Sequence, residues 1–100
     1  MIKHVTLWKL KAEACGNDME TNYRISKEMT EDLLKDFPKM ISAEVHRGFT
    51  TGKNRCDMCK IFTFATKEDL EEFLHSPIHE KYKKFNDEIR ESNTVIDYEV

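Results

Sequence analysis

The sequence has no long apolar run, and it is poor in the residues that interrupt regular structure. It holds three glycines and two prolines among 100 residues, and its mean hydropathy is -0.68. Without a run of about 20 apolar residues, the sequence predicts no transmembrane helix and no membrane partner. Lys9 and Lys11 interrupt the first apolar segment, so we expect no signal peptide and a cytoplasmic location.

The sequence also lacks an excess of basic charge and a paired set of cysteines. The net charge is -3, and acidic and basic residues are mixed along the chain, so no basic stripe predicts nucleic acid as a partner. Three cysteines are an odd number, which favours reduced thiols. Cys56 and Cys59 have a CxxC spacing, but residues three apart on a strand point to opposite faces. With no second pair, we predict neither a zinc site nor a redox site.

What the sequence does contain is the composition of one soluble globular domain, over residues 1–100. Hydrophobic residues make up 39% of the chain and charged residues 35%. A chain of this length buries roughly two-thirds of the surface that its unfolded form exposes, which leaves no material for a second core.

Short stretches rich in β-branched and aromatic residues predict four strands, at residues 2–10, 42–49, 57–65 and 94–100. Within the first strand, His4, Thr6 and Trp8 share one face, because side chains alternate along a strand. Val5 and Leu7 share the opposite face.

Apolar residues at three- and four-residue steps predict helices between these strands. An amphipathic helix runs from Met19 to Phe37 and ends there, because the residue before Pro38 disfavours the helical conformation. Thr66 is a helix N-cap, and Ser76 followed by Pro77 is a second helix start. The second helical region then continues to Ile89.

The order β-α-β-β-α-β is that of the ferredoxin-like α+β fold, with a four-stranded antiparallel sheet and the helices on one face. The other face of this sheet is unusual, because Val5, Leu7, Cys59 and Ile61 make it apolar. An apolar sheet face needs a second layer, and another copy of the chain supplies it most simply. We predict a homodimer that packs sheet to sheet.

With these elements in place, the chain resembles the stress-responsive A/B barrel family, also called Dabb or dimeric α/β barrel proteins. The resemblance rests on short motifs that recur in order along the whole chain: Ile2 to Val5, Leu7 to Lys11, Phe37-Pro38, Glu44-Val45, Asp57, Phe64-Ala65, Ser76 to His79 and Ile96 to Val100. It implies a ferredoxin-like protomer, a dimer whose two sheets form a barrel, and a cleft between the sheet and the helices.

The resemblance also bears on chemistry. A plant polyketide cyclase of this family uses a histidine that matches His79 together with a nearby tyrosine. The position that matches the tyrosine is Phe73, which has no hydroxyl group to hold a proton. Many bacterial members resemble this chain and have no assigned activity.

Two histidines are the candidates for proton transfer. His79 lies in the first turn of a predicted helix, where the partial positive charge of free N–H groups disfavours imidazolium. A neutral His79 suits a general base, and His4 is its candidate orienting partner from the first strand. The alternative is that both histidines hold a buried hydrogen-bond network without chemistry. A metal site with Asp97 would need a geometry that nothing in the sequence fixes, so we predict no metal and no cofactor.

Candidate ligand-binding residues share the helix-facing side of the predicted sheet or the helices above it, and are Trp8, Lys60, Phe64, Phe73 and Tyr82. For the four aromatic residues the alternative is ordinary core packing. Lys60 lies between apolar neighbours, so it either extends to the rim or presents a cation to an anionic ligand.

The sequence therefore predicts a homodimer of this family that binds a small apolar ligand in a cleft between sheet and helices, or that serves as an accessory protein. The alternative is a cofactor-independent enzyme of cyclase, lyase or oxygenase type, with His79 as the base.

Overall fold

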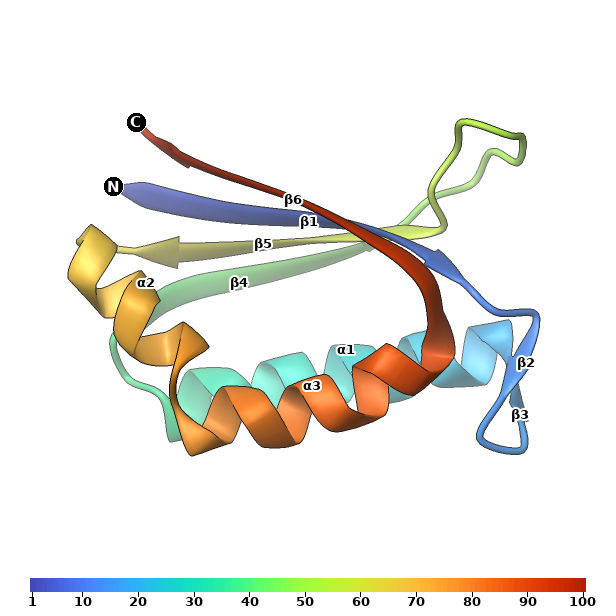
Figure 1. The fold of residues 1–100 in the computed structure, drawn as a ribbon, viewed down its shortest axis with the longest axis horizontal. Coiled ribbons are helices and arrows are strands. Elements are labelled where there is room, and N and C mark those ends of the chain that lie inside the picture. Colours follow the sequence, from blue (N-terminus) through green and yellow to red (C-terminus); the bar gives the residue numbers. More distant parts are fainter.

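The computed structural model describes residues 1–100 and has a four-stranded antiparallel sheet with three helices on one face (Figure 1). The order of the strands across the sheet is β4 (Met40–Arg47), β5 (Met58–Phe64), β1 (Ile2–Leu10) and β6 (Arg90–Glu99). This order and the chain order confirm the predicted ferredoxin-like α+β fold. The two chain termini lie together at one end of the sheet (Figure 1).

Two predicted strands are shifted along the sequence. The strand expected at residues 42–49 is β4, Met40–Arg47, and Phe49 lies beyond it with its side chain 97% exposed. The strand expected at residues 94–100 begins at Arg90, directly after the preceding helix. The longer β6 pairs with β1 over its whole length. This pairing satisfies backbone groups that a loop would leave to water.

The helices begin and end at residues whose chemistry fixes the boundary. α1 spans Met19–Asp36, with Asp18 as its N-cap. α2 spans Lys67–Leu74 after Thr66, and α3 spans Pro77–Ile89 after Ser76. The backbone N–H of His79 donates to the Ser76 hydroxyl at 3.1 Å, so the cap that starts α3 also fixes the position of His79.

A small hairpin that was not predicted connects β1 to α1. β2 (Glu13–Ala14) pairs with β3 (Asn17–Asp18) through a two-residue turn at Cys15 and Gly16, both with positive φ. Two positive φ angles are the signature of a type I′ turn, which glycine favours. The Asn22 side chain donates to the Ala14 carbonyl at 2.9 Å and so joins the hairpin to α1.

The core lies between the sheet and the helices and is largely aromatic. Phe73 of α2 is fully buried, and its ring centroid lies 5.4 to 5.9 Å from those of Phe37, Phe62 and Phe64. Full burial of such a side chain contributes about 1.5–3 kcal/mol. This contact holds the corner between α2 and α3 against the sheet.

The opposite face of the sheet carries no helix (Figure 1). Register places Val5 of β1 between Ile61 of β5 and Ile96 of β6, with Leu7 and Tyr98 on the same face. Ile96 is 59% exposed, and Tyr98 and Leu7 are also exposed. We call these five residues the open apolar face. None of the helices is long and apolar enough to span a bilayer.

Candidate functional site

His4 faces the helices from β1 and is held by an acidic neighbour. Its Nδ1 lies 2.5 Å from Oδ1 of Asp97, the residue directly opposite it on β6. With Nδ1–H donating to the carboxylate, the lone pair of His4 is on Nε2. The group that orients His4 itself is Asp97, and the role of His4 as an orienting partner of His79 stays a prediction.

His79 lies across from His4, at the start of α3, and is half-buried. Its ring centroid is 5.0 Å from that of Phe73 and 6.0 Å from that of Tyr82. Burial is the main cause that lowers the pKa of His79 below its ordinary value, and the positive charges of Lys83 and Arg90 and a charged His4 act in the same direction. The neutral state expected from the sequence is thus favoured mainly by desolvation.

The two histidines share one cavity, which we call the histidine cleft. It has a volume of about 270 Å³ between β1, β6 and α3. Its walls are His4, Thr6, Trp8, Phe62, Leu74, His79, Tyr82, Lys83, Arg90, Asn93, Val95 and Asp97. A concave, largely apolar space with a few convergent polar groups is what a small-molecule site requires.

Of the residues that the sequence pointed to, His4, His79, Trp8 and Tyr82 come together in this cleft. Phe64 and Phe73 are fully buried in the core and do not line it. The lining residues that no sequence pattern marked as candidates include Thr6, Arg90 and Asn93. Of these, only Thr6 carried a signal, as a polar residue between His4 and Trp8 on an inward face.

Lys60 does not reach the rim, contrary to one reading of the sequence. Its side chain is 1% exposed, and Nζ lies 4.5 Å from the ring centroid of Trp8 and 4.6 Å from that of Tyr82. These two rings are walls of the histidine cleft, so Lys60 lies behind the walls and not among the lining residues.

Four oxygens surround the Lys60 amine, and none belongs to a carboxylate. Nζ lies 2.6 Å from Ser26 Oγ, 2.8 Å from Thr30 Oγ1, 2.8 Å from the Tyr82 hydroxyl and 3.3 Å from the Ser26 carbonyl. Burial, with a smaller contribution from the charge of Arg90, lowers the pKa of Lys60 well below its ordinary value. A buried ammonium without a counter-ion is costly, so this site favours the neutral amine.

The Lys60 amine belongs to a larger hydrogen-bond network inside the fold. Nζ donates to the hydroxyl oxygens of Ser26, Thr30 and Tyr82. Ser26 donates to the side-chain oxygen of Asn86 at 2.5 Å, and Thr30 donates to the Ser26 carbonyl at 2.9 Å. We call these five residues the Lys60 cluster.

The cysteines form no site of their own. Cys15, Cys56 and Cys59 are all free, and burial raises the pKa of the Cys59 thiol, which favours its unreactive form. No group of three or more His, Cys, Asp or Glu side chains is arranged to hold a metal ion.

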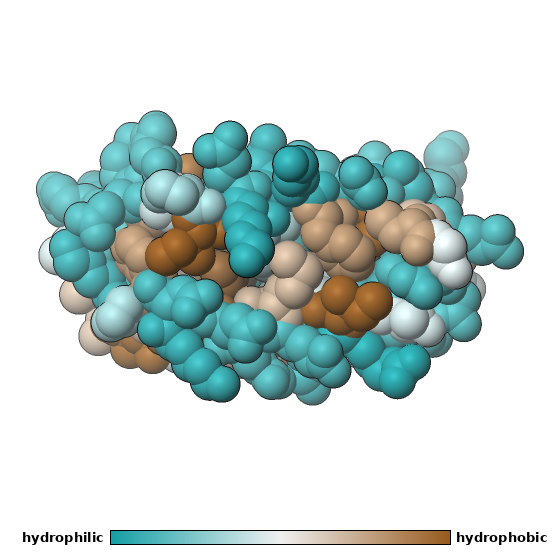
Figure 2. Space-filling model, turned by 90° about the horizontal axis from the view of Figure 1, so that it is seen from below, coloured by the Kyte–Doolittle hydropathy of each residue, from teal (hydrophilic) through white to brown (hydrophobic).

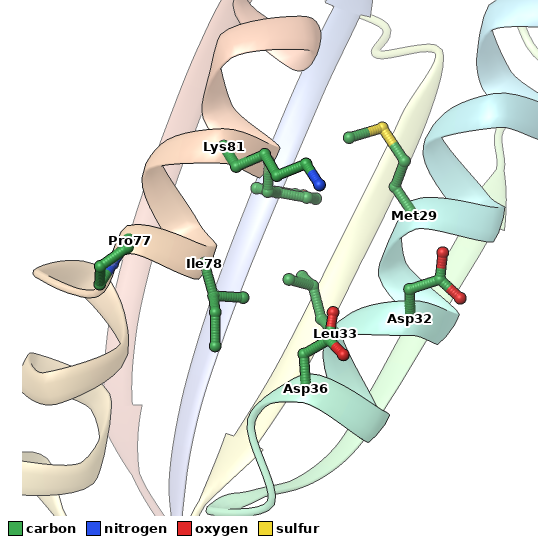
Figure 3. Close-up of a pocket in the computed structure, with 8 residues that line it drawn as sticks. Met29, Asp32, Leu33, Asp36, Pro77, Ile78 and Lys81 are labelled. Atoms are coloured by element: carbon green, nitrogen blue, oxygen red, sulfur yellow. The ribbon is translucent and has the colours of Figure 1, made fainter.

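A second cavity lies between α1 and α3 and has a volume of about 410 Å³. Figure 2 shows the helical side of the molecule, where apolar surface lies between hydrophilic rims. In Figure 3, Asp32 and Asp36 extend from α1 while Ile78 and Lys81 extend from α3. Tyr82 lines this cavity too, but its hydroxyl is already bonded to Lys60. This groove has no buried polar group free to orient a ligand, so the histidine cleft is the better candidate site.

Comparison with known proteins agrees with this fold. The family model described as Stress responsive A/B Barrel Domain matches residues 2–100. A dimeric protein of unknown function and ferredoxin-like fold from Bacteroides fragilis is 24% identical, with a TM-score of 0.81 over 99% of this chain and 95% of that chain. No curated protein matches the sequence.

Two further solved structures are similar over nearly the whole chain. A hydroxynitrile lyase from Passiflora edulis is 15% identical, with a TM-score of 0.82 over 99% of this chain and 92% of that one. A Dabb family protein with a ferredoxin-like fold from Mesorhizobium loti is 17% identical, with a TM-score of 0.75 over 99% of this chain and 95% of that one. At these identities the likeness shows the fold and carries no activity across.

The Lys60 cluster makes stability depend on pH. Between the lowered pKa of Lys60 and its ordinary value of 10.5, the unfolded chain binds a proton that the folded protein does not, so the free energy of unfolding rises with pH. The slope is at most about 1.4 kcal/mol per pH unit. Urea unfolding of wild type and Lys60→Met from pH 7 to 10 isolates this contribution, because both share every other titrating group. Parallel pH profiles for the two proteins would show that Lys60 is charged in the fold.

Proposed function

Because the chain belongs to the stress-responsive A/B barrel family, we propose that it forms a homodimer whose histidine cleft binds a small, largely apolar molecule. The observation that carries the proposal is the cleft itself. In it, the buried His4 and the half-buried His79 face an apolar space between the sheet and α3. We also propose a cytoplasmic location, since all three cysteines are free. If the cleft binds no small molecule, we propose instead that the protein serves as an accessory protein that needs no ligand.

The open apolar face supports the homodimer. Val5, Leu7, Ile61, Ile96 and Tyr98 form a contiguous apolar surface on a sheet that has helices only on its other side. Surfaces of this kind on soluble proteins mark interfaces, and a two-fold axis lets one patch cover its own copy. The relative from Bacteroides fragilis is described as dimeric, which agrees with this arrangement.

Adjacent residues of β6 provide a matched test of the dimer. Ile96 lies on the open apolar face and is 59% exposed, whereas Val95 points to the helical side and is 45% exposed. We expect wild type and Val95→Lys to scatter light as twice the chain mass of 11.9 kDa, and Ile96→Lys to dissociate, because it places a charge in the interface. A folded wild-type monomer at all concentrations would contradict the proposal.

The ligand-binding proposal is tested with substitutions at the same two positions. Here Val95 is the test position and Ile96 is the control. Trp8 is the one tryptophan of the chain and lines the cleft, so its fluorescence reports on occupancy. We expect 3-phenylpropanoate or 3-phenylpropanamide to change this fluorescence saturably. Val95→Phe fills the cleft and should abolish the response, whereas Ile96→Phe, on the other face, should keep it. If neither compound changes the fluorescence of the wild type, the cleft does not accept small aromatic molecules.

A second candidate function is proton abstraction by a cofactor-independent enzyme of cyclase, lyase or oxygenase type. The observation that favours it is the pair of histidines at one cavity, with His4 oriented by Asp97 and the pKa of His79 lowered by burial. Phe73 packs against His79 without a hydroxyl group, so a base–phenol pair would have to use another residue. Only this candidate predicts turnover of a bound ligand, at a rate that falls as the pH drops through the pKa of His79.

A further inference from the structure

Two polar atoms beside the histidine cleft have no partner. The hydroxyl of Thr6 and the indole N–H of Trp8 are the buried side-chain nitrogen and oxygen atoms that make no hydrogen bond. Both residues are more than nine-tenths buried, with Thr6 6% and Trp8 1% exposed, and both line the cleft. Buried polar groups in folded proteins nearly always have a hydrogen-bond partner, so two unpaired polar atoms at one cavity need an explanation.

Both unpaired groups can donate a hydrogen bond. An indole N–H only donates, and a threonine hydroxyl donates or accepts as its surroundings require. No acceptor of the protein lies within hydrogen-bond distance of either atom, and Oδ1 of Asp97, the one carboxylate that lines the cleft, is bonded to His4. What these two donors lack is therefore an acceptor within hydrogen-bond distance.

Most of the charged side chains that line the cleft are basic, and its one carboxylate, Asp97, is paired with His4. The charged neighbours that influence His79 are His4, Lys83 and Arg90, all cations when charged, and each disfavours a further positive charge there. The Arg90 guanidinium lies 4.5 Å from the centre of the Trp8 ring, on the same wall as the unpaired indole N–H. A negatively charged oxygen at this wall would meet free donors and a nearby cation together.

We propose that the ligand of the histidine cleft is a monocarboxylate with an apolar body, whose carboxylate oxygens are bound by the Thr6 hydroxyl and the Trp8 indole N–H. This inference rests on the proposed function and names the class of its ligand. The apolar body lies against Phe62, Leu74 and Val95, and the charge lies on the side of Arg90. Thr6 and Trp8 are then specificity-determining residues of the site.

The proposal distinguishes two compounds of the same shape. 3-Phenylpropanamide keeps the aromatic body of 3-phenylpropanoate, but replaces one acceptor oxygen by an NH₂ donor and removes the charge. We expect the wild type to bind the carboxylate at least about tenfold more tightly than the amide, because hydrogen bonds to charged groups are the strong ones. Isothermal titration calorimetry measures both dissociation constants without relying on the Trp8 signal.

Two variants assign the preference to Thr6. Thr6→Val has nearly the same shape without the hydroxyl, so it should lose most of the preference for the carboxylate while its melting temperature stays equal or rises, because an unpaired buried hydroxyl has been removed. Thr6→Ser keeps the hydroxyl and should keep the preference. A purely structural role of Thr6 would move the melting temperature and leave the ratio of the two dissociation constants unchanged.

Each remaining outcome is decisive. Equal binding of carboxylate and amide by the wild type overturns this inference and leaves the proposed ligand-binding function standing. Preference for the carboxylate that persists in Thr6→Val overturns the assignment to Thr6. Binding of neither compound contradicts both the proposed function and the inference built on it.

Discussion

The buried amine of Lys60, whose pKa is lowered by burial, is the constraint around which the interior is arranged. It extends from β5, one of the two central strands, and meets Ser26 and Thr30 of α1 and Tyr82 of α3, so one side chain ties the sheet to both long helices. Each of those hydroxyl groups would be costly to bury alone, and the amine would be costlier still as an ammonium. Because Trp8 and Tyr82 cover Nζ, the same cluster also fixes two walls of the histidine cleft.

The alternation of side chains along β1 separates the two surfaces to which we assign proposed functions. His4, Thr6 and Trp8 face the cleft, while Val5 and Leu7 belong to the open apolar face. β6 continues the same division, with Val95 and Asp97 on one side and Ile96 and Tyr98 on the other. The proposed ligand and the proposed second protomer would therefore contact different sides of the same two strands, which is why single substitutions on β6 can test the two proposals independently.

Much of this arrangement could be predicted from the sequence, because it depends on local patterns. Strand alternation gave the two faces of β1, and the Ser76-Pro77 start placed His79 on the first turn of α3. The pairing of His4 with Asp97 could not be predicted, since it depends on the register between β1 and β6, which are 93 residues apart at this contact. The sequence indicates the Lys60 cluster only weakly. Ser26 interrupts an apolar stripe of a helix, and Lys60 interrupts an apolar face of a strand. The contact between these two polar residues depends on the packing of α1 on the sheet, which no local pattern predicts.

The central claim is that the interior is built around an uncharged Lys60, and nuclear magnetic resonance of the lysine Nζ and Cε atoms tests it most directly. The Lys60 signal is identified by its absence in Lys60→Met, and its shifts are followed from neutral to alkaline pH. The account predicts the shifts of a neutral amine for Lys60 under conditions in which the exposed lysines are still ammonium groups. A Lys60 signal that titrates together with those lysines, near 10.5, would contradict it.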